Sequence, residues 1–146
     1  MVTNVKIVQK AAIIFENKIL VVKRSKNDSF RANCWDFPGG NVDDRDVAEF
    51  ENKVLIMSLI REIKEEVNID IGEDQIKPIY VNPGGKRDNN TLFVWIGYKV
   101  TTEKHQEVKL SEEHSEYKWV DLKEFESLDF NDPPGVFLKV GKMAMS

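Results

Sequence analysis

The chain has 146 residues, of which 41% are hydrophobic and 32% are charged, a composition typical of a single globular domain. Its formal net charge of −4 argues against a protein that coats duplex nucleic acid, because neutralising phosphates requires a basic surface. No apolar run approaches the roughly 20 residues of a membrane span, and the N-terminus lacks the apolar core of a signal peptide. The single cysteine, Cys34, excludes an internal disulfide and favours a reducing compartment. From these observations together we expect a cytoplasmic protein without a membrane partner.

The first part of the chain predicts two strands followed by a long loop. Residues 5–14 and 19–24 are rich in Val and Ile and flank a tight turn, as in an antiparallel pair. Residues 25–46 contain many turn-forming residues and few apolar runs. A loop of this length in a small domain is usually functional.

A long amphipathic helix is predicted next. From Val47 to Val67, apolar residues recur every three or four positions, as on the buried stripe of a helix. Asp46 is a candidate N-cap for this helix. Asn68 can adopt the left-handed conformation that ends it.

The second half of the chain alternates shorter elements. Strands are predicted at 76–81 and 92–100, and an acidic loop at 110–116 leads into a further strand at 117–122. A short helix at 122–128 and a final helix after the Asn131-Asp132-Pro133-Pro134 start signal complete the chain. This order predicts an α/β or α+β layered domain with a mixed sheet, and we expect residues 1–146 to form one domain.

Two short motifs have both a structural and a chemical interpretation. On a helix, Glu62 lies three residues before Glu65 and four before Glu66, so the three carboxylates share one face. That face is either simply solvated or binds a divalent cation, because Mg²⁺ prefers oxygen ligands. The pair Gly39 and Gly40 either forms a turn or lets the backbone approach a ligand closely.

Together these motifs resemble the signature of the Nudix hydrolase family. That signature is G-x5-E-x7-R-E-U-x-E-E-x-G-U, where U is aliphatic. Gly40, at the end of the segment Trp-Asp-Phe-Pro-Gly-Gly, matches its first glycine, and the second half is matched by Arg61, Glu62, Ile63, Glu65, Glu66 and Ile69. The strands expected at 19–24 and 117–122 also resemble family segments, so the likeness covers most of the chain. The resemblance implies a Nudix-like α/β/α sandwich with a mixed central sheet. It also implies hydrolysis of a nucleoside diphosphate linked to another group X.

The sequence departs from this signature between its two halves. Gly40 and Arg61 enclose residues 41–60, which is seven more than the family pattern contains. The first glutamate of the signature has no clean counterpart, since counting forward from Gly40 reaches Asp46 and counting back from Arg61 reaches Lys53. In the family this glutamate mainly orients the arginine, so the departure concerns the orientation of Arg61 more than the metal ligands.

The resemblance implies a site for Mg²⁺, with Mn²⁺ as a possible substitute. The ligands that it implies are the Gly39 carbonyl and the carboxylates of Glu62, Glu65 and Glu66, with Arg61 orienting these carboxylates. The general base stays open. Glu62 is one candidate, and the acidic loop supplies Glu113 as the first choice for a late metal ligand or base, unless that loop is only a solvated turn. His114 beside it is more often structural than catalytic in such a loop.

Within the family, the Trp-x-Phe-Pro-Gly-Gly form resembles MutT-type nucleoside triphosphate pyrophosphohydrolases. The resemblance implies that the residues framing the nucleotide are Arg24, Phe37, Gly40 and Asn131. A ring under a base contributes about 1–3 kcal/mol, but Phe37 could equally belong to the core. Arg24 could be surface charge, and Asn131 a helix cap. The expected reaction converts a (deoxy)nucleoside triphosphate to the monophosphate and pyrophosphate.

Two other function classes remain open at this point. A non-catalytic Nudix-fold module that senses a nucleotide or binds a protein would explain the stretched signature. An acidic Ca²⁺-binding or structural protein fits the net charge, but the chain lacks an EF-hand pattern. The expected partner is a small nucleotide rather than duplex nucleic acid, and the expected assembly is a monomer or a homodimer.

Overall fold

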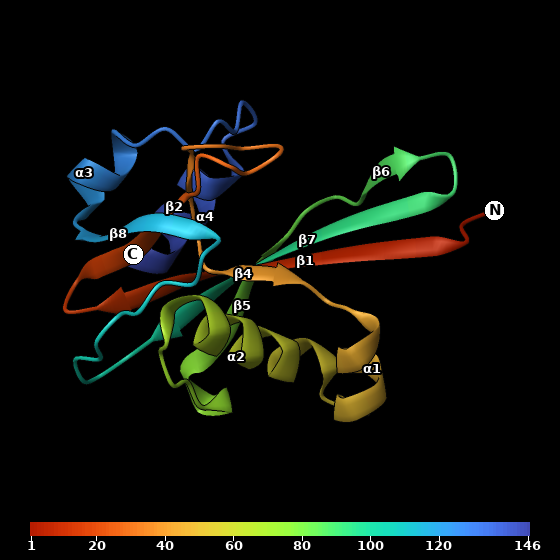
Figure 1. Cartoon of the computed structure of the whole chain (residues 1–146), viewed down its shortest axis with the longest axis horizontal. Helices are drawn as coiled ribbons and strands as arrows, with labels where there is room; N and C mark the ends of the chain where they lie inside the picture. Colours follow the sequence, from red (N-terminus) through yellow and green to blue (C-terminus); the bar gives the residue numbers. More distant parts are fainter.

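Eight strands form one sheet in the computed structural model, which describes residues 1–146 (Figure 1). In chain order the strands are β1 (Asn4–Phe15), β2 (Lys18–Arg24), β3 (Trp35–Asp36), β4 (Gly39–Asn41), β5 (Ile76–Val81), β6 (Gly85–Asp88), β7 (Thr91–Thr101) and β8 (His114–Val120). The helices are α1 (Asp44–Phe50), α2 (Val54–Val67), α3 (Leu122–Glu126) and α4 (Val136–Met145), with one turn of 3-10 helix at Glu73–Gln75.

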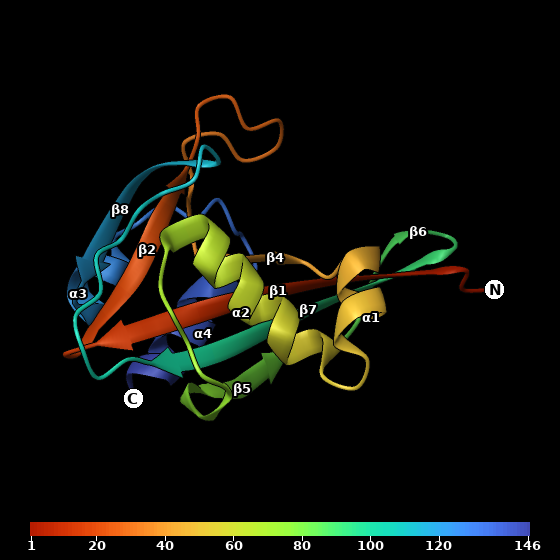
Figure 2. The same cartoon turned by 60° about the horizontal axis from the view of Figure 1, so that its bottom comes forward.

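Strand β1 gives the sheet its mixed character. It runs parallel to β7 from the pair Asn4–Thr91 to the pair Ile14–Thr101, whereas β2 and β4 pair with it in the antiparallel sense. The order across the sheet is β3-β2-β1-β7-β5, with β4 beside β1, β6 beside β7 and β8 beside β2. Helix α2 covers one face of the sheet, and α3 and α4 cover the other (Figure 1 and Figure 2). The predicted fold class, a mixed sheet between helical layers, is confirmed.

The alternating side chains of β1 contribute to the core on both faces of the sheet. Ala11 and Ile13 pack with Leu59 and Ile63 of α2, while Ala12 points to the aromatic cluster beneath α3 and α4. Burying one Leu or Ile side chain contributes about 1.5–3 kcal/mol, so the apolar stripe anchors α2 to the sheet. No helix has the length and apolar composition that a membrane span requires.

The single helix predicted over 47–67 is wrong in its first part. Helix α1 ends at Phe50, Glu51 adopts a positive φ of 44°, and α2 begins only at Val54. The spacing concealed this break because Val47 continues the apolar periodicity, although its side chain is exposed. The seven extra residues therefore accommodate a short separate helix rather than a longer α2.

Asp46 is correspondingly not the N-cap of the long helix. It lies in the first turn of α1, where Asp43 is the cap: the Asp43 carboxylate accepts a hydrogen bond from the Asp46 N–H at 3.1 Å. The Asp46 carboxylate in turn accepts from the Asp43 N–H at 2.9 Å, which completes a reciprocal capping pair. At the other end, Asn68 terminates α2 in the left-handed conformation, with φ of 63°, as predicted.

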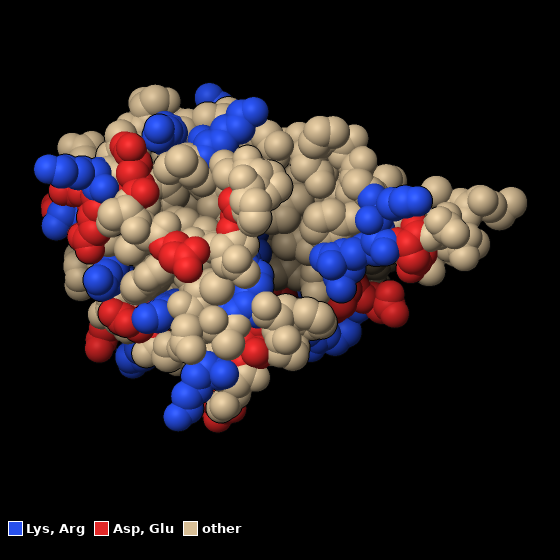
Figure 3. Space-filling model, turned by 90° about the horizontal axis from the view of Figure 1, so that it is seen from above, with Lys and Arg blue, Asp and Glu red and all other residues tan.

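Two of the predicted loops contain short strands. β3 and β4 lie within residues 25–46, and β6 lies in the turn-rich segment before β7. β8 begins at His114, so this histidine belongs to the sheet rather than to the acidic loop. β6 and the adjoining parts of β1 and β7 form an arm that ends near the N-terminus (Figure 1). Seen from above, the molecule is hollowed between this arm and the remaining elements, with Lys and Arg side chains at the edges of the hollow (Figure 3).

Candidate active site

Two glycines of β4 allow the backbone to pass close to the carboxylates of α2. Gly39 has a φ of +140°, and a Cβ at this position would lie 2.0 Å from the Gln9 carbonyl oxygen on β1. Its N–H donates a 2.6 Å hydrogen bond to Glu66 Oε2. A Cβ on Gly40 would lie 2.9 Å from the Glu62 carboxylate. The two halves of the signature thus meet in space, and glycine is what permits the contact.

Asp46 takes the position of the missing signature glutamate. Arg61 donates to both of its oxygens, from Nε to Oδ1 at 2.8 Å and from a terminal nitrogen to Oδ2 at 2.9 Å, and Ser58 Oγ adds a 2.9 Å hydrogen bond. Burial alone would raise the pKa of the Asp46 carboxyl, but these donors lower it to about 2. Lys53, the other counted position, makes only an exposed ion pair with Glu73 at 3.0 Å. Counting forward from Gly40 therefore identifies the carboxylate that replaces the signature glutamate. The seven extra residues lie between Asp46 and Arg61.

Arg61 links this acid to the first two carboxylates of the helix. Its remaining contacts run to Glu65 Oε2 at 3.0 Å and to Glu62 Oε1 at 3.2 Å. The Asp46 hydrogen bonds, which are the largest influence, raise the pKa of the guanidinium. Burial raises the pKa of Glu62, against the effect of Arg61. These contacts fit the orienting role expected for Arg61.

Glu66 lacks a comparable cationic partner. Its side chain is 7% exposed, and burial raises its pKa to about 8, with further contributions from the charges of Glu62 and Glu113. Lys10 and the Gly39 N–H act in the opposite direction but do not offset the burial. A carboxylate in this state is stabilised in its charged form by any cation placed beside it.

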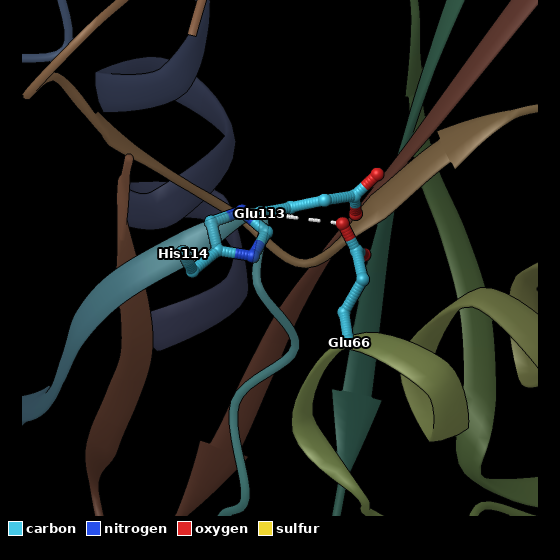
Figure 4. Close-up of side chains that lie close together, drawn as sticks. All are labelled: Glu66, Glu113 and His114. Carbon is cyan, nitrogen blue, oxygen red and sulfur yellow. Dashed lines mark ion pairs between the residues drawn. The ribbon is translucent and has the colours of Figure 1, made fainter. Parts of the chain in front are cut away.

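Glu113 and His114 lie opposite Glu66 at the start of β8 (Figure 4). One candidate ligand atom from each of the three residues lies within 4.8 Å of the others. His114 Nε2 is 3.9 Å from Glu66 Oε1, and its Nδ1 is buried without a hydrogen-bond partner. The donor set is mainly carboxylate oxygen, which suits a hard divalent cation. The residues therefore fit the metal that the family implies.

A second charged cluster, which sequence inspection missed, lies beside this site. Asp36 is wholly buried, and its Oδ2 is 2.8 Å from Arg24, 3.1 Å from Lys10 and 3.7 Å from Arg31. Burial would raise the pKa of Asp36, but the three cations lower it below its ordinary value. No spacing in the sequence indicates this cluster, because its members come from β1, β2, β3 and the loop between β2 and β3.

The four residues expected to frame a nucleotide lie in different environments, and Gly40 lies against the Glu62 carboxylate. Arg24 is occupied by ion pairs with Asp36 and with Asp28 at 2.6 Å. Phe37 has no exposed surface, and its ring packs 5.3 Å from that of Phe137, so in this structure it is a core residue that a base cannot reach. Asn131 is exposed, with a φ of 46°, and it does not cap α4.

Comparisons with known proteins place this geometry in a family. A model of the NUDIX domain family matches residues 7–139. The MutT protein from Methanosarcina mazei Go1 is similar with a TM-score of 0.68 at 24% identity, covering 97% of this chain and 93% of that one. A MutT NUDIX hydrolase from Burkholderia pseudomallei gives 0.67 at 23%, covering 98% and 99%.

A third similar structure was solved with a ligand. It is the NUDIX domain of Shewanella oneidensis NrtR complexed with ADP ribose, with a TM-score of 0.67 at 18% identity, covering 100% of this chain and 90% of that one. No curated protein matches the chain. The structural similarities establish the fold, and the family match spans nearly all of the sequence, including both halves of the signature. The chain belongs to the NUDIX domain family, and its fold is that of the MutT-type Nudix hydrolases.

Proposed function

We propose that the protein is a divalent-metal-dependent pyrophosphohydrolase. It cleaves a pyrophosphate bond in a nucleoside diphosphate linked to X, and the substrate that we favour is a (deoxy)nucleoside triphosphate, converted to the monophosphate and pyrophosphate. The observation that carries this proposal is Glu66, a buried carboxylate that faces Glu113 and lacks a cationic partner of its own. Such a carboxylate lowers the stability of the fold when it is ionised, and a bound cation would offset this cost.

The residues proposed to hold Mg²⁺ are those of the signature, with one addition from the turn just before β8. They are the carboxylates of Glu62, Glu65, Glu66 and Glu113, together with the Gly39 carbonyl. When bound, the cation would neutralise pyrophosphate oxygens and lower the pKa of a water molecule positioned for attack.

Around that centre, the protein's own side chains maintain geometry and accept a proton. Asp46 holds Arg61, which holds Glu62 and Glu65, so these carboxylates are oriented before substrate arrives. Water attacks one phosphorus while the bond from that phosphorus to the bridging oxygen breaks, and the leaving group, pyrophosphate or the nucleoside monophosphate, keeps the electron pair. The proton passes to a carboxylate, for which Glu113 is our first candidate and Glu62 the second.

Recognition of the nucleotide is proposed for the side of the site near β2 and the segment before α4. Asn131 is exposed and carries an amide that can pair with a base edge. Arg24 is ion-paired with Asp28 and Asp36, but its cluster with Lys10 and Arg31 keeps a net positive charge that would attract phosphate. The ADP ribose complex of the Shewanella domain supports a nucleotide ligand in this fold. Phe37 is not part of this proposal, because its ring is buried.

A non-catalytic module on the same fold is the second candidate. The observation that favoured it was the stretched signature with no first glutamate. Asp46 now supplies that carboxylate and binds Arg61 through both oxygens, so the departure no longer argues against hydrolysis. The catalytic proposal is therefore the stronger one.

A product assay tests the proposal. Nucleoside triphosphates, oxidised dGTP, ADP-ribose, dinucleoside polyphosphates and nucleotide sugars are incubated with Mg²⁺, with Mn²⁺ or with EDTA. The Glu65→Gln variant is tested in parallel, with Glu126→Gln as a matched control, because Glu126 lies on α3, outside the proposed ligand set. We expect metal-dependent release of a nucleoside monophosphate that Glu65→Gln loses and Glu126→Gln keeps. Nucleotide binding without product under every condition would instead favour the non-catalytic module.

A further inference from the structure

His114 is buried but makes none of the side-chain hydrogen bonds expected of a structural histidine. It is the first residue of β8, opposite Arg24 of β2, and only 3% of its side chain is exposed. Buried polar side chains nearly always have a hydrogen-bond partner. Here Nδ1 is buried with no partner, and Nε2 lies 3.9 Å from Glu66 Oε1, which is beyond hydrogen-bond distance. Hydrogen bonding to the protein therefore does not explain why the ring is there.

The ring does face groups that bind cations. Glu66 and Glu113 each present a carboxylate oxygen within 4.8 Å of a His114 nitrogen, and Figure 4 shows the three side chains converging between β8 and the end of α2. A cation among them would accept a lone pair from one ring nitrogen of His114 and charge from both carboxylates. The same ion would compensate the buried Glu66 and give the imidazole a partner.

We propose that His114 is a nitrogen ligand of the divalent cation, and that it shifts the preference of the site from Mg²⁺ toward Mn²⁺ or Co²⁺. This inference rests on the proposed function, because it concerns the cation at that same site. Mg²⁺ takes oxygen ligands almost exclusively, whereas the later divalent metals bind imidazole well. One nitrogen among oxygen ligands therefore distinguishes this site from an all-carboxylate one.

Pulsed electron paramagnetic resonance of Mn²⁺ bound to the full chain tests the proposal directly. A coordinated imidazole nitrogen produces a modulation of the Mn²⁺ echo, which a purely oxygen-ligated ion lacks. We expect this modulation in the wild type, with its frequency changed when histidine is labelled with the heavier nitrogen isotope. It should vanish in His114→Gln and persist in His105→Asn. His105 is the matched control because it is the other histidine of the chain and lies on an exposed segment.

Metal titrations give a second readout on the same proteins. We expect the ratio of the Mg²⁺ dissociation constant to the Mn²⁺ dissociation constant to fall by at least about tenfold in His114→Gln. The labelled wild type requires no variant, so a folding defect in His114→Gln would leave the spectroscopic test intact.

The possible results separate this inference from the proposed function. Mn²⁺ bound by the wild type without nitrogen modulation would overturn the role of His114, and metal-dependent hydrolysis would still stand. Nitrogen modulation that survives in His114→Gln would overturn it as well. A wild type that binds neither Mn²⁺ nor Mg²⁺ and hydrolyses no nucleotide would refute both proposals.

Discussion

Asp46 of α1 and Glu66 of α2 are both buried carboxylates, yet their surroundings shift their pKa values in opposite directions. The side chain of Asp46 is 1% exposed and that of Glu66 is 7% exposed. The pKa of Asp46 is lowered to about 2, whereas burial raises that of Glu66 to about 8. Asp46 accepts hydrogen bonds from two nitrogens of Arg61 and from the Ser58 hydroxyl. Glu66 accepts one from a backbone N–H and otherwise faces Glu113 and His114.

The difference separates carboxylates that stabilise the structure of the site from carboxylates that are available to bind a ligand. A buried carboxylate with a full set of donors holds a fold in one geometry, and Asp36 with its three cations is of the same kind. A buried carboxylate without a counter-charge lowers stability when ionised, so its partner is expected to come from outside the chain. Substitutions of Glu66 and of Asp46 test this distinction.

The largest expected effect is that of Glu66→Gln on turnover. The amide removes a metal-binding charge but keeps an oxygen that can accept the Gly39 N–H, so we expect turnover to fall by at least ~10²-fold with the fold intact. Steady-state hydrolysis with saturating Mg²⁺ measures the loss, and circular dichroism checks the fold. Activity near that of the wild type would contradict the assignment of Glu66.

The same variant should be the more stable protein when no metal is present. A raised pKa means that the folded state binds more protons than the unfolded state between the ordinary value of 4.5 and about 8. The free energy of unfolding of the metal-free wild type therefore falls as pH rises through this window. Glu66→Gln lacks this fall, and denaturant unfolding in EDTA at pH 6 and pH 9 reveals it. A parallel pH dependence in both proteins would show that Glu66 is not the group responsible.

The next largest effect is that of Asp46→Asn on stability. The substitution leaves Arg61 with an incomplete set of acceptors, which we expect to cost about 2 kcal/mol. Turnover should fall less than in Glu66→Gln, because Glu62 and Glu65 are disordered rather than removed. Asp44→Asn is the control, since Asp44 lies in the same helical turn and is exposed. Equal stability of the two variants would refute the pairing.

The affinity for Mg²⁺ should rise with pH because of the raised pKa of Glu66. Below about pH 8 this carboxyl is protonated and must lose its proton before it can bind a cation, so the affinity should rise with pH. The slope approaches tenfold per pH unit for one proton (about 1.4 kcal/mol). The groups facing Glu66 are Glu62 and Glu113, which raise its pKa, Lys10, which lowers it, and His114. Calorimetric titrations from pH 6 to pH 9 measure the slope, and an affinity independent of pH would exclude Glu66 as a ligand.

The smallest expected effect concerns nucleotide recognition. Asn131→Ala removes one hydrogen bond to a base edge, worth about 1 kcal/mol, so KM should rise about fivefold while kcat changes little. Steady-state kinetics on the best substrate of the panel measures both constants. Asn89→Ala, in the exposed turn between β6 and β7, is the control. A fall in kcat with constant KM would assign Asn131 a different role.

Local pattern was enough to predict most of the fold and half of the site. The stripe through Leu59 and Ile63 and the Val- and Ile-rich segments of β1 and β2 specify their own periodicity. Helical spacing likewise places Glu62, Glu65 and Glu66 on one face. These features depend only on neighbours in the sequence.

Features that depend on tertiary contacts were not predictable in the same way. The break after α1 is invisible because Val47 keeps the apolar spacing while exposed. Whether Phe37 meets a base or the core depends on Phe125 and Phe137, which are distant in sequence. The burial of His114 follows from where β8 starts. The choice between Asp46 and Lys53 also required the position of Arg61 in space.

The most direct test of the account is the number of protons released when a cation binds. Mg²⁺ is titrated at pH 7 into wild type and Glu66→Gln in two buffers of different ionisation enthalpy. With a pKa of about 8, Glu66 is mostly protonated in the metal-free protein, so the wild type should release about one proton more per cation than the variant. Equal proton release by the two proteins, with Mg²⁺ bound equally well, would show that the Glu66 carboxylate is not a ligand of the metal.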